Sequence, residues 1–107
     1  MDFDNSQRKE DRRRAVRVPL KVALEIEGVD FAGNPFKETA TTVDVSLTGA
    51  CICTTARVAP GAILKVSGVK FRFSAIVSVR GVWMDESDGI QKMGVMFLER
   101  DDNWVVK

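Results

Sequence analysis

The sequence contains no histidine and no tyrosine, and its 107 residues include only two cysteines. Histidine is the side chain best suited to act as a general base near neutral pH, and a catalytic nucleophile needs such a base within hydrogen-bonding reach. The chain shows no nucleophile–base pairing and no plausible cluster of metal ligands. We therefore expect no catalytic residue and no metal site, and a protein that is not an enzyme.

The two cysteines, Cys51 and Cys53, are separated by one residue. In a strand this spacing places both side chains on the same face, where neighbours of one strand rarely form a disulfide. A metal site would need further ligands. We interpret the pair as two small, buried, apolar side chains.

Long apolar runs are also missing from the chain. No run approaches the ~20 residues that cross a bilayer, and the first seventeen residues are too charged for a secretory signal. We expect no membrane insertion and a cytoplasmic location.

Charge is unevenly distributed along the sequence. Residues 1–17 carry six basic and four acidic groups, whereas residues 18–107 carry ten basic and eleven acidic groups. A domain that binds long nucleic acid usually has a basic face on its body as well. The basic arm, residues 8–17, therefore favours a compact anion over a nucleic acid.

Hydrophobic alternation predicts an all-β domain. Side chains alternate strictly from Val18 to Ile26, which indicates a half-buried strand with Val18, Leu20 and Val22 on its inner face. Further strands are expected at residues 36–45, 50–56, 63–66, 71–84 and 91–98, separated by Gly- and Pro-containing turns. Thr39, Thr41, Val43 and Val45 are expected to share one face. Six short antiparallel strands in a chain of this size indicate one small β-barrel.

The barrel is expected to span residues 18–98. Residues 1–7 are predicted to be flexible, and the arm that follows them is predicted to be mobile without a ligand because no apolar face supports it. The tail, residues 99–107, is compatible with a short terminal helix, and Trp104 could pack back on the barrel.

Two short motifs stand out. Arg13 and Arg17 form an Arg-x-x-x-Arg pattern with Arg12 directly before it, and Asp44, Ser46 and Gly49 form an Asp-x-Ser-x-x-Gly pattern. Taken singly, the first is compatible with a solvated basic tail. The second is compatible with an ordinary turn, in which Asp caps the backbone and Gly supplies a positive φ.

Taken together, the two motifs resemble the PilZ domain family. Val18-Pro19-Leu20 after the second arginine and Gly94-Val95-Met96-Phe97 in the last strand extend the resemblance over about residues 8–98. The tail is short for the helix often appended to this fold. The resemblance implies a six-stranded barrel that binds cyclic di-GMP, a bacterial second messenger, and no other cofactor.

The residues can be compared with the chemistry of that ligand. A guanidinium fork suits both the O6/N7 edge of guanine and phosphate, which fits Arg13 and Arg17. A carboxylate such as that of Asp44 can accept the N1–H and N2–H₂ groups of guanine. Ser46 can donate to phosphate or a base, and Gly49 would allow a tight turn and close approach.

Further residues extend this binding hypothesis. The resemblance implies that Arg12 favours two stacked ligand molecules per site, because another guanidinium neutralises added charge and stacks on a base. Arg14 could contribute similarly or face solvent, and Arg80 could contact phosphate or solvent. Trp83 could stack on a guanine at the edge of the pocket if a bulge at Gly81 turns it outward; otherwise it belongs to the core.

We expect a receptor whose arginine arm becomes ordered over the ligand and signals to an unidentified downstream protein. Two alternatives remain open at this point. One is a PilZ-like protein-interaction module without a ligand, and the other is a small-barrel nucleic-acid binder.

Overall fold

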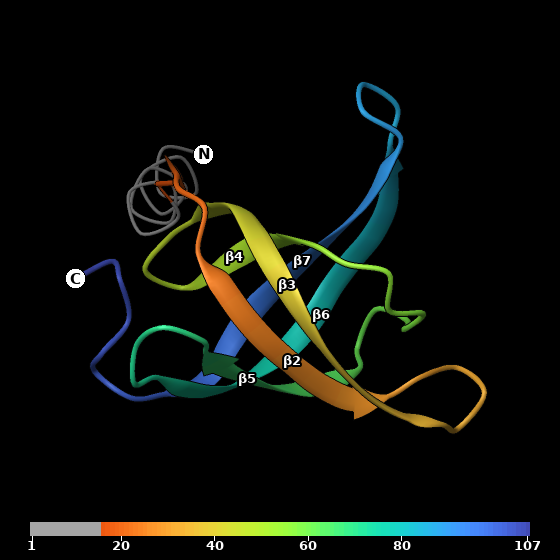
Figure 1. The fold of residues 1–107 in the computed structure, drawn as a ribbon, viewed down its shortest axis with the longest axis horizontal. Helices are drawn as coiled ribbons and strands as arrows, with labels where there is room; N and C mark the ends of the chain where they lie inside the picture. The colour runs from red at the N-terminus through yellow and green to blue at the C-terminus, as the bar shows by residue number, and fades with distance from the viewer. Residues whose placement is uncertain (1–15) are drawn as a thin grey trace, which may run out of the picture.

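The computed structural model describes residues 16–107, all of whose regular elements are strands (Figure 1). The seven strands are β1 (Val18–Pro19), β2 (Ala23–Val29), β3 (Pro35–Val45), β4 (Gly49–Cys53), β5 (Ile63–Gly68), β6 (Ser74–Asp85) and β7 (Ile90–Arg100).

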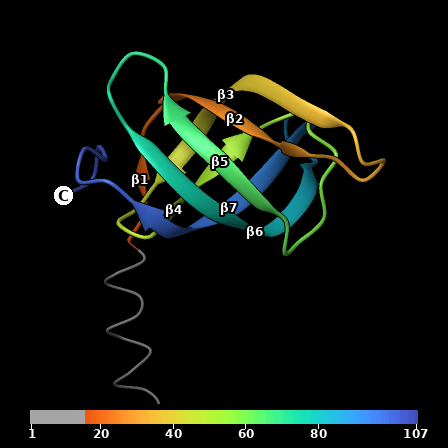
Figure 2. The ribbon, with the colours of Figure 1, turned by 90° about the horizontal axis from the view of Figure 1, so that it is seen from below.

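Six of these strands form a closed antiparallel barrel, as the sequence predicted. Their order is β3-β2-β5-β6-β7-β4, and pairing of β3 with β4 closes the ring (Figure 2). Closure removes the exposed edges that a small open sheet would have. The remaining strand, β1, is a short additional element that pairs with the end of β3. Val18 lies opposite Val45, and Pro19 lies opposite Asp44.

The core fills the barrel interior and continues under the C-terminal tail. Among its members, Ile26, Val77 and Met93 are completely or almost completely buried, and so is Trp104. The Trp104 ring packs against Phe73 and Phe97, with ring centroids 4.8 and 5.0 Å away. The aromatic rings close one end of the barrel and hold the tail against it.

The prediction of one continuous strand from Val18 to Ile26 is wrong in its first part. The chain leaves regular pairing between β1 and β2, and Val18 and Leu20 are exposed. The Thr42 hydroxyl donates to the Leu20 carbonyl at 2.6 Å and accepts from the Val22 N–H at 2.8 Å. A side chain on β3 thus replaces ladder hydrogen bonds at the break.

The expectation that Thr39, Thr41, Val43 and Val45 share one face is also wrong, since only Val45 is buried. The pairing of β3 with β4 shifts register between Thr42 and Asp44, so Val43 is an extra, exposed residue. The buried side chains are Ala40, Thr42 and Val45 instead. A bulge reverses the alternation of every residue after it, and this one turns Asp44 from the interior to the outer face.

A second bulge lies in β6. Pairing with β7 shifts between Val79 and Gly81, which leaves Arg80 unpaired. Before the bulge Val79 is buried, whereas beyond it Trp83 is 44% exposed. From the sequence, Trp83 was expected to face outward only if a bulge lay at Gly81. The structure has this bulge, and Trp83 faces outward.

The tail does not form the terminal helix with which its sequence is compatible. β7 extends to Arg100, and a turn follows in which Asp101 accepts hydrogen bonds from the N–H groups of Ser74 and Asn103. Burial of Trp104 and the partial burial of Val106 stabilise an extended path instead.

Residues 1–15, which include Arg8, Lys9 and Arg12–Arg14, lie outside the described part of the chain. The prediction of a flexible arm stays a prediction. Within residues 16–107, no helix is long and apolar enough to cross a membrane.

Candidate functional site

A pocket of about 280 Å³ lies on the outer wall of the barrel, over β4 and β7 and beside the two bulges. Its lining includes Arg17, Asp44, Ser46, Gly49, Arg80 and Gly94. The chain folds so that two motifs far apart in sequence meet here, because β1 pairs with the end of β3 that leads into the loop between β3 and β4.

Asp44 and Arg17 face each other across one side of the pocket. Arg17 Nη1 lies 3.8 Å from Asp44 Oδ1, a separation too long for a hydrogen bond. Among residues 16–107, that carboxylate oxygen is buried and accepts no hydrogen bond, although the Asp44 side chain as a whole is 22% exposed. A buried carboxylate oxygen without a donor is energetically unfavourable, so this atom is an unsatisfied acceptor beside the pocket.

Ser46 shapes the loop between β3 and β4. Its hydroxyl accepts hydrogen bonds from the N–H groups of Thr48 and Gly49, each at 3.2 Å, and its own N–H donates to the Gly49 carbonyl at 2.9 Å. The hydroxyl proton has only long contacts of 3.4 Å, with Thr48 Oγ1 and the Gly49 carbonyl. The side chain therefore maintains the turn and retains a weakly engaged donor.

Gly49 is required for a close approach of two strands. A Cβ at this position would collide with the carbonyl oxygen of Val95 and would lie 3.1 Å from Met96 Cα. Its φ is not positive, so the idea that this glycine supplies a left-handed turn residue is wrong. The other expectation from the sequence, close approach, describes the position correctly.

The loop is also tied to β7 and to the tail. The Phe97 N–H donates to the Thr48 carbonyl at 2.8 Å, and the buried indole N–H of Trp104 donates to the Ser46 carbonyl, also at 2.8 Å. The turn is held by hydrogen bonds on both sides, which fixes the shape of the pocket wall before a ligand arrives.

The bulge in β6 supplies the opposite side of the site. Arg80 lines the pocket and is exposed, with Nη1 3.9 Å from Met96 Sδ. The Trp83 ring lies over two glycines, since a Cβ on Gly94 or on Gly81 would be 3.6 to 3.8 Å from the indole. The two glycines therefore place no side chain beneath the indole.

Cys51 and Cys53 lie beside the pocket and are not members of the main core cluster, although Cys51 is buried. Asp44 and Gly94 pair with Cys51 on either side, and both thiols are free. Burial, reinforced by the Asp44 carboxylate, raises the pKa of the Cys51 thiol. The expectation of two small buried side chains is right for Cys51, whereas Cys53 is half-buried.

The structure brings together Arg17, Asp44, Ser46 and Gly49 of the residues singled out in the sequence, with Trp83 nearby and Arg80 among the lining. Arg12, Arg13 and Arg14 lie outside the described residues. No three His, Cys, Asp or Glu side chains within residues 16–107 are grouped so as to bind a metal ion.

Sequence reasoning missed several contributors to the site. Ala50 and Met96 line the pocket, and the Trp104 N–H supports its loop. The only available signal for Trp104 was its apolar character, shared with Val105 and Val106, in an otherwise polar tail. The small residue Gly94 was noted only as part of a motif, because its position beneath Trp83 depends on the register of β6 and β7.

Comparison with known proteins gives two findings. The family model for the PilZ domain matches residues 6–103. A solved structure of the Bacillus subtilis inhibitor of motility (MotI/DgrA) is similar in fold, with a TM-score of 0.67 and 14% sequence identity. The similarity covers 81% of this chain and 43% of the other, so this chain spans less than half of that protein. A search of curated proteins finds no match.

Proposed function

Because this chain belongs to the PilZ domain family, we propose that it is a receptor for cyclic di-GMP. The dinucleotide binds between the N-terminal arginine arm and the loop that contains Asp44, Ser46 and Gly49. The ligand is a bacterial second messenger, so the protein acts in a bacterial cytoplasm.

The observation that carries the proposal is the buried Asp44 oxygen that accepts no hydrogen bond among the described residues. Guanine presents two donors on one edge, N1–H and N2–H₂, and a carboxylate can accept from both. A ligand that satisfies this oxygen gains charge-assisted hydrogen bonds and removes an unfavourable feature of the free protein. The Arg17 guanidinium lies 3.8 Å from this oxygen and remains free to turn toward the ligand.

The charges around the pocket match a dianion with two guanine bases. Arg17 and Arg80 line it from opposite sides, and both are arginines, whose planar fork fits phosphate and the O6/N7 edge of guanine. We assign Arg13 the same role as Arg17 from the other end of the motif. Ser46 contributes its weakly engaged hydroxyl proton to phosphate or a base.

The pocket itself, about 280 Å³, is small for a dinucleotide. The ligand would extend beyond it across the surface formed by Gly94 and Cys51 toward Trp83, whose exposed indole offers a stacking face. The arginine arm would cover the other side. Arg12 then adds the charge needed for a second stacked molecule, and Arg14 lies close enough in sequence to assist.

Signalling follows from the ordering of the arm. Charge-assisted contacts fold the arginines over the ligand, and the ordered arm with the filled pocket presents a new surface to a downstream protein. The neighbour in fold is named an inhibitor of motility, and an action of that kind on a cellular process fits a receptor without catalytic groups.

Calorimetric titration of the chain with cyclic di-GMP tests the proposal. Saturable binding with one or two molecules per chain is expected, with Arg12→Ala reducing two to one. An absence of binding would leave the fold as a ligand-free interaction module. Preferential binding of single-stranded oligonucleotides with steep salt dependence would identify a nucleic-acid binder instead.

A further inference from the structure

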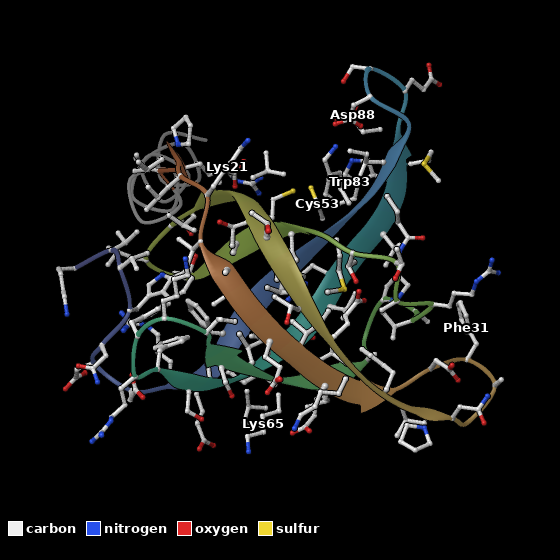
Figure 3. All side chains as sticks on the ribbon, viewed as in Figure 1. Lys21, Phe31, Cys53, Lys65, Trp83 and Asp88 are labelled. Atoms are coloured by element: carbon white, nitrogen blue, oxygen red, sulfur yellow. The ribbon has the colours of Figure 1, made fainter. Side chains whose placement is uncertain are left out.

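A buried lysine lies next to the candidate site, at the base of the hairpin formed by β6 and β7. The Lys92 side chain is only 4% exposed, although it stands on the outer surface of the barrel. Its neighbours across the two adjacent strands are Trp83 in β6 and Cys53 in β4. Figure 3 shows Trp83 and Cys53 where the hairpin leaves the barrel, with Asp88 farther out.

Two carboxylates of the hairpin hold the Lys92 ammonium group. Nζ lies 2.7 Å from Asp88 Oδ2 and 3.1 Å from Asp85 Oδ2. The hydrogen bond to Asp88 is the main reason that the pKa of Lys92 is raised, in spite of its loss of hydration. The lysine therefore stays charged and bridges the end of β6 and the connecting turn.

Hydrogen bonds within the β6–β7 turn fix the two carboxylates in place. Asp85 Oδ1 accepts from both the N–H and the hydroxyl of Ser87, and Asp88 Oδ1 accepts from the Ile90 N–H. The remaining oxygen of each carboxylate is the one that contacts Lys92. Each Asp thus joins the turn backbone to the lysine.

Trp83 is the residue of β6 that lies beside this arrangement. It stands opposite Lys92 in the ladder, where side chains on one face have Cβ atoms about 5 Å apart. Gly81 and Gly94 lie under the ring and provide no side chain to hold it laterally. On the same face, the buried side chain of Lys92 is anchored at its far end by Asp85 and Asp88.

We propose that Lys92 is a positioning residue, held by Asp85 and Asp88, that keeps Trp83 flat over Gly81 and Gly94 as the stacking wall of the site. This inference rests on the proposed cyclic di-GMP binding. An apolar side chain of similar length would fill the same volume but would have no anchor in the turn, so the hairpin and the indole would move.

A double-mutant cycle in cyclic di-GMP affinity tests the coupling. Trp83→Ala should weaken binding about tenfold, the magnitude of one base–aromatic stack. Lys92→Met should weaken binding about fivefold with Trp83 present but less than twofold in the Trp83→Ala background, and Lys92→Arg should restore most of the loss. An equal loss in both backgrounds, or no loss in either, would overturn the proposal.

A second readout does not depend on the ligand. Acrylamide quenching of tryptophan fluorescence reports mainly on Trp83, because Trp104 is fully buried, and the Trp83→Phe variant gives the Trp104 background. Lys92→Met should increase quenching, as should the milder Asp88→Asn, which serves if Lys92→Met folds poorly. Lys65→Met, at an exposed lysine of the barrel wall, is the matched control and should leave the quenching unchanged.

The two readouts separate the two hypotheses. If the wild-type chain does not bind cyclic di-GMP, the proposed function fails and the stacking role of Trp83 falls with it. If the chain binds the ligand but quenching is the same in Lys92→Met, Asp88→Asn and wild type, the positioning role of Lys92 is overturned and the proposed function stands.

Discussion

The indole N–H of Trp104 donates a 2.8 Å hydrogen bond to the backbone carbonyl of Ser46, across 58 positions of sequence. The bond connects the C-terminal tail to the loop that carries the Asp-x-Ser-x-x-Gly motif. The tail is therefore part of the support of the candidate site, and its loss is expected to affect both stability and binding.

Trp104→Phe should destabilise the protein by about 2 kcal/mol, because the Ser46 carbonyl loses a buried donor and the smaller ring leaves a cavity. Urea unfolding measures the change. Val105→Ala, at an exposed neighbour, is the control and should alter stability by less than about 0.5 kcal/mol. Equal stability of the Trp104 variant and wild type would show that the bond is unimportant.

Gly49→Ala should disrupt the pairing of β4 with β7, because the added methyl group would meet the Val95 carbonyl oxygen. We expect a loss of about 2 kcal/mol in unfolding free energy, typical of forced overpacking, together with weaker ligand binding. Gly81→Ala is the comparison in thermal melts, since its Cβ would make only ordinary contacts at 3.8 Å. A Gly49 variant as stable as the Gly81 variant would contradict the close-approach explanation.

Thr42→Val keeps the side-chain volume but removes two hydrogen bonds of the Thr42 hydroxyl. These bonds replace ladder hydrogen bonds at the break between β1 and β2. The site is 1% exposed, so leaving the Val22 N–H and Leu20 carbonyl unpaired should cost about 2 kcal/mol. The adjacent Thr41→Val, on the exposed face, should be nearly neutral by the same denaturant measurement. Similar effects of the two substitutions would rule out a special role for the Thr42 hydroxyl.

Protonation of Asp85 in the hairpin of β6 and β7 should lower the stability of the protein at low pH. Hydrogen bonds from Ser87, and then from Lys92, lower the pKa of Asp85 from its ordinary 3.8 to about 2. A lowered folded-state pKa gives stabilisation that is present above pH 3.8 and is lost as pH falls toward 2. Asp85→Asn should flatten this part of the profile in unfolding measured from pH 6 to pH 2, whereas Glu86→Gln should not.

The sequence was sufficient to predict the barrel and the proximity of Arg17 to the Asp44 loop. Hydrophobic alternation and the order of the motifs can be recognised without knowing the strand register. It was not sufficient where register changes. The bulge at Val43 adds one residue that no local pattern marks, and Gly81 indicated the bulge at Arg80 only as one of two possibilities. The two bulges decide that Asp44 and Trp83 face outward.

Long-range polar contacts could not be predicted from the sequence either. The Lys92 contacts to Asp85 and Asp88 depend on hairpin geometry, and the break between β1 and β2 depends on the hydroxyl of a residue about twenty positions away. The tail was compatible with a helix by composition, but Trp104 burial and the hydrogen bonds of Asp101 outweigh that local preference. These interactions follow from tertiary packing, which propensity does not describe.

The most direct test of the account is the affinity for cyclic di-GMP of the Arg13→Ala, Arg17→Ala and Asp44→Ala variants, measured by isothermal titration against wild type. Each variant loses charge-assisted hydrogen bonds worth about 2 kcal/mol, so each should bind about thirtyfold more weakly while the melting temperature confirms an intact fold. Unchanged affinity in all three variants would contradict the assignment of the site.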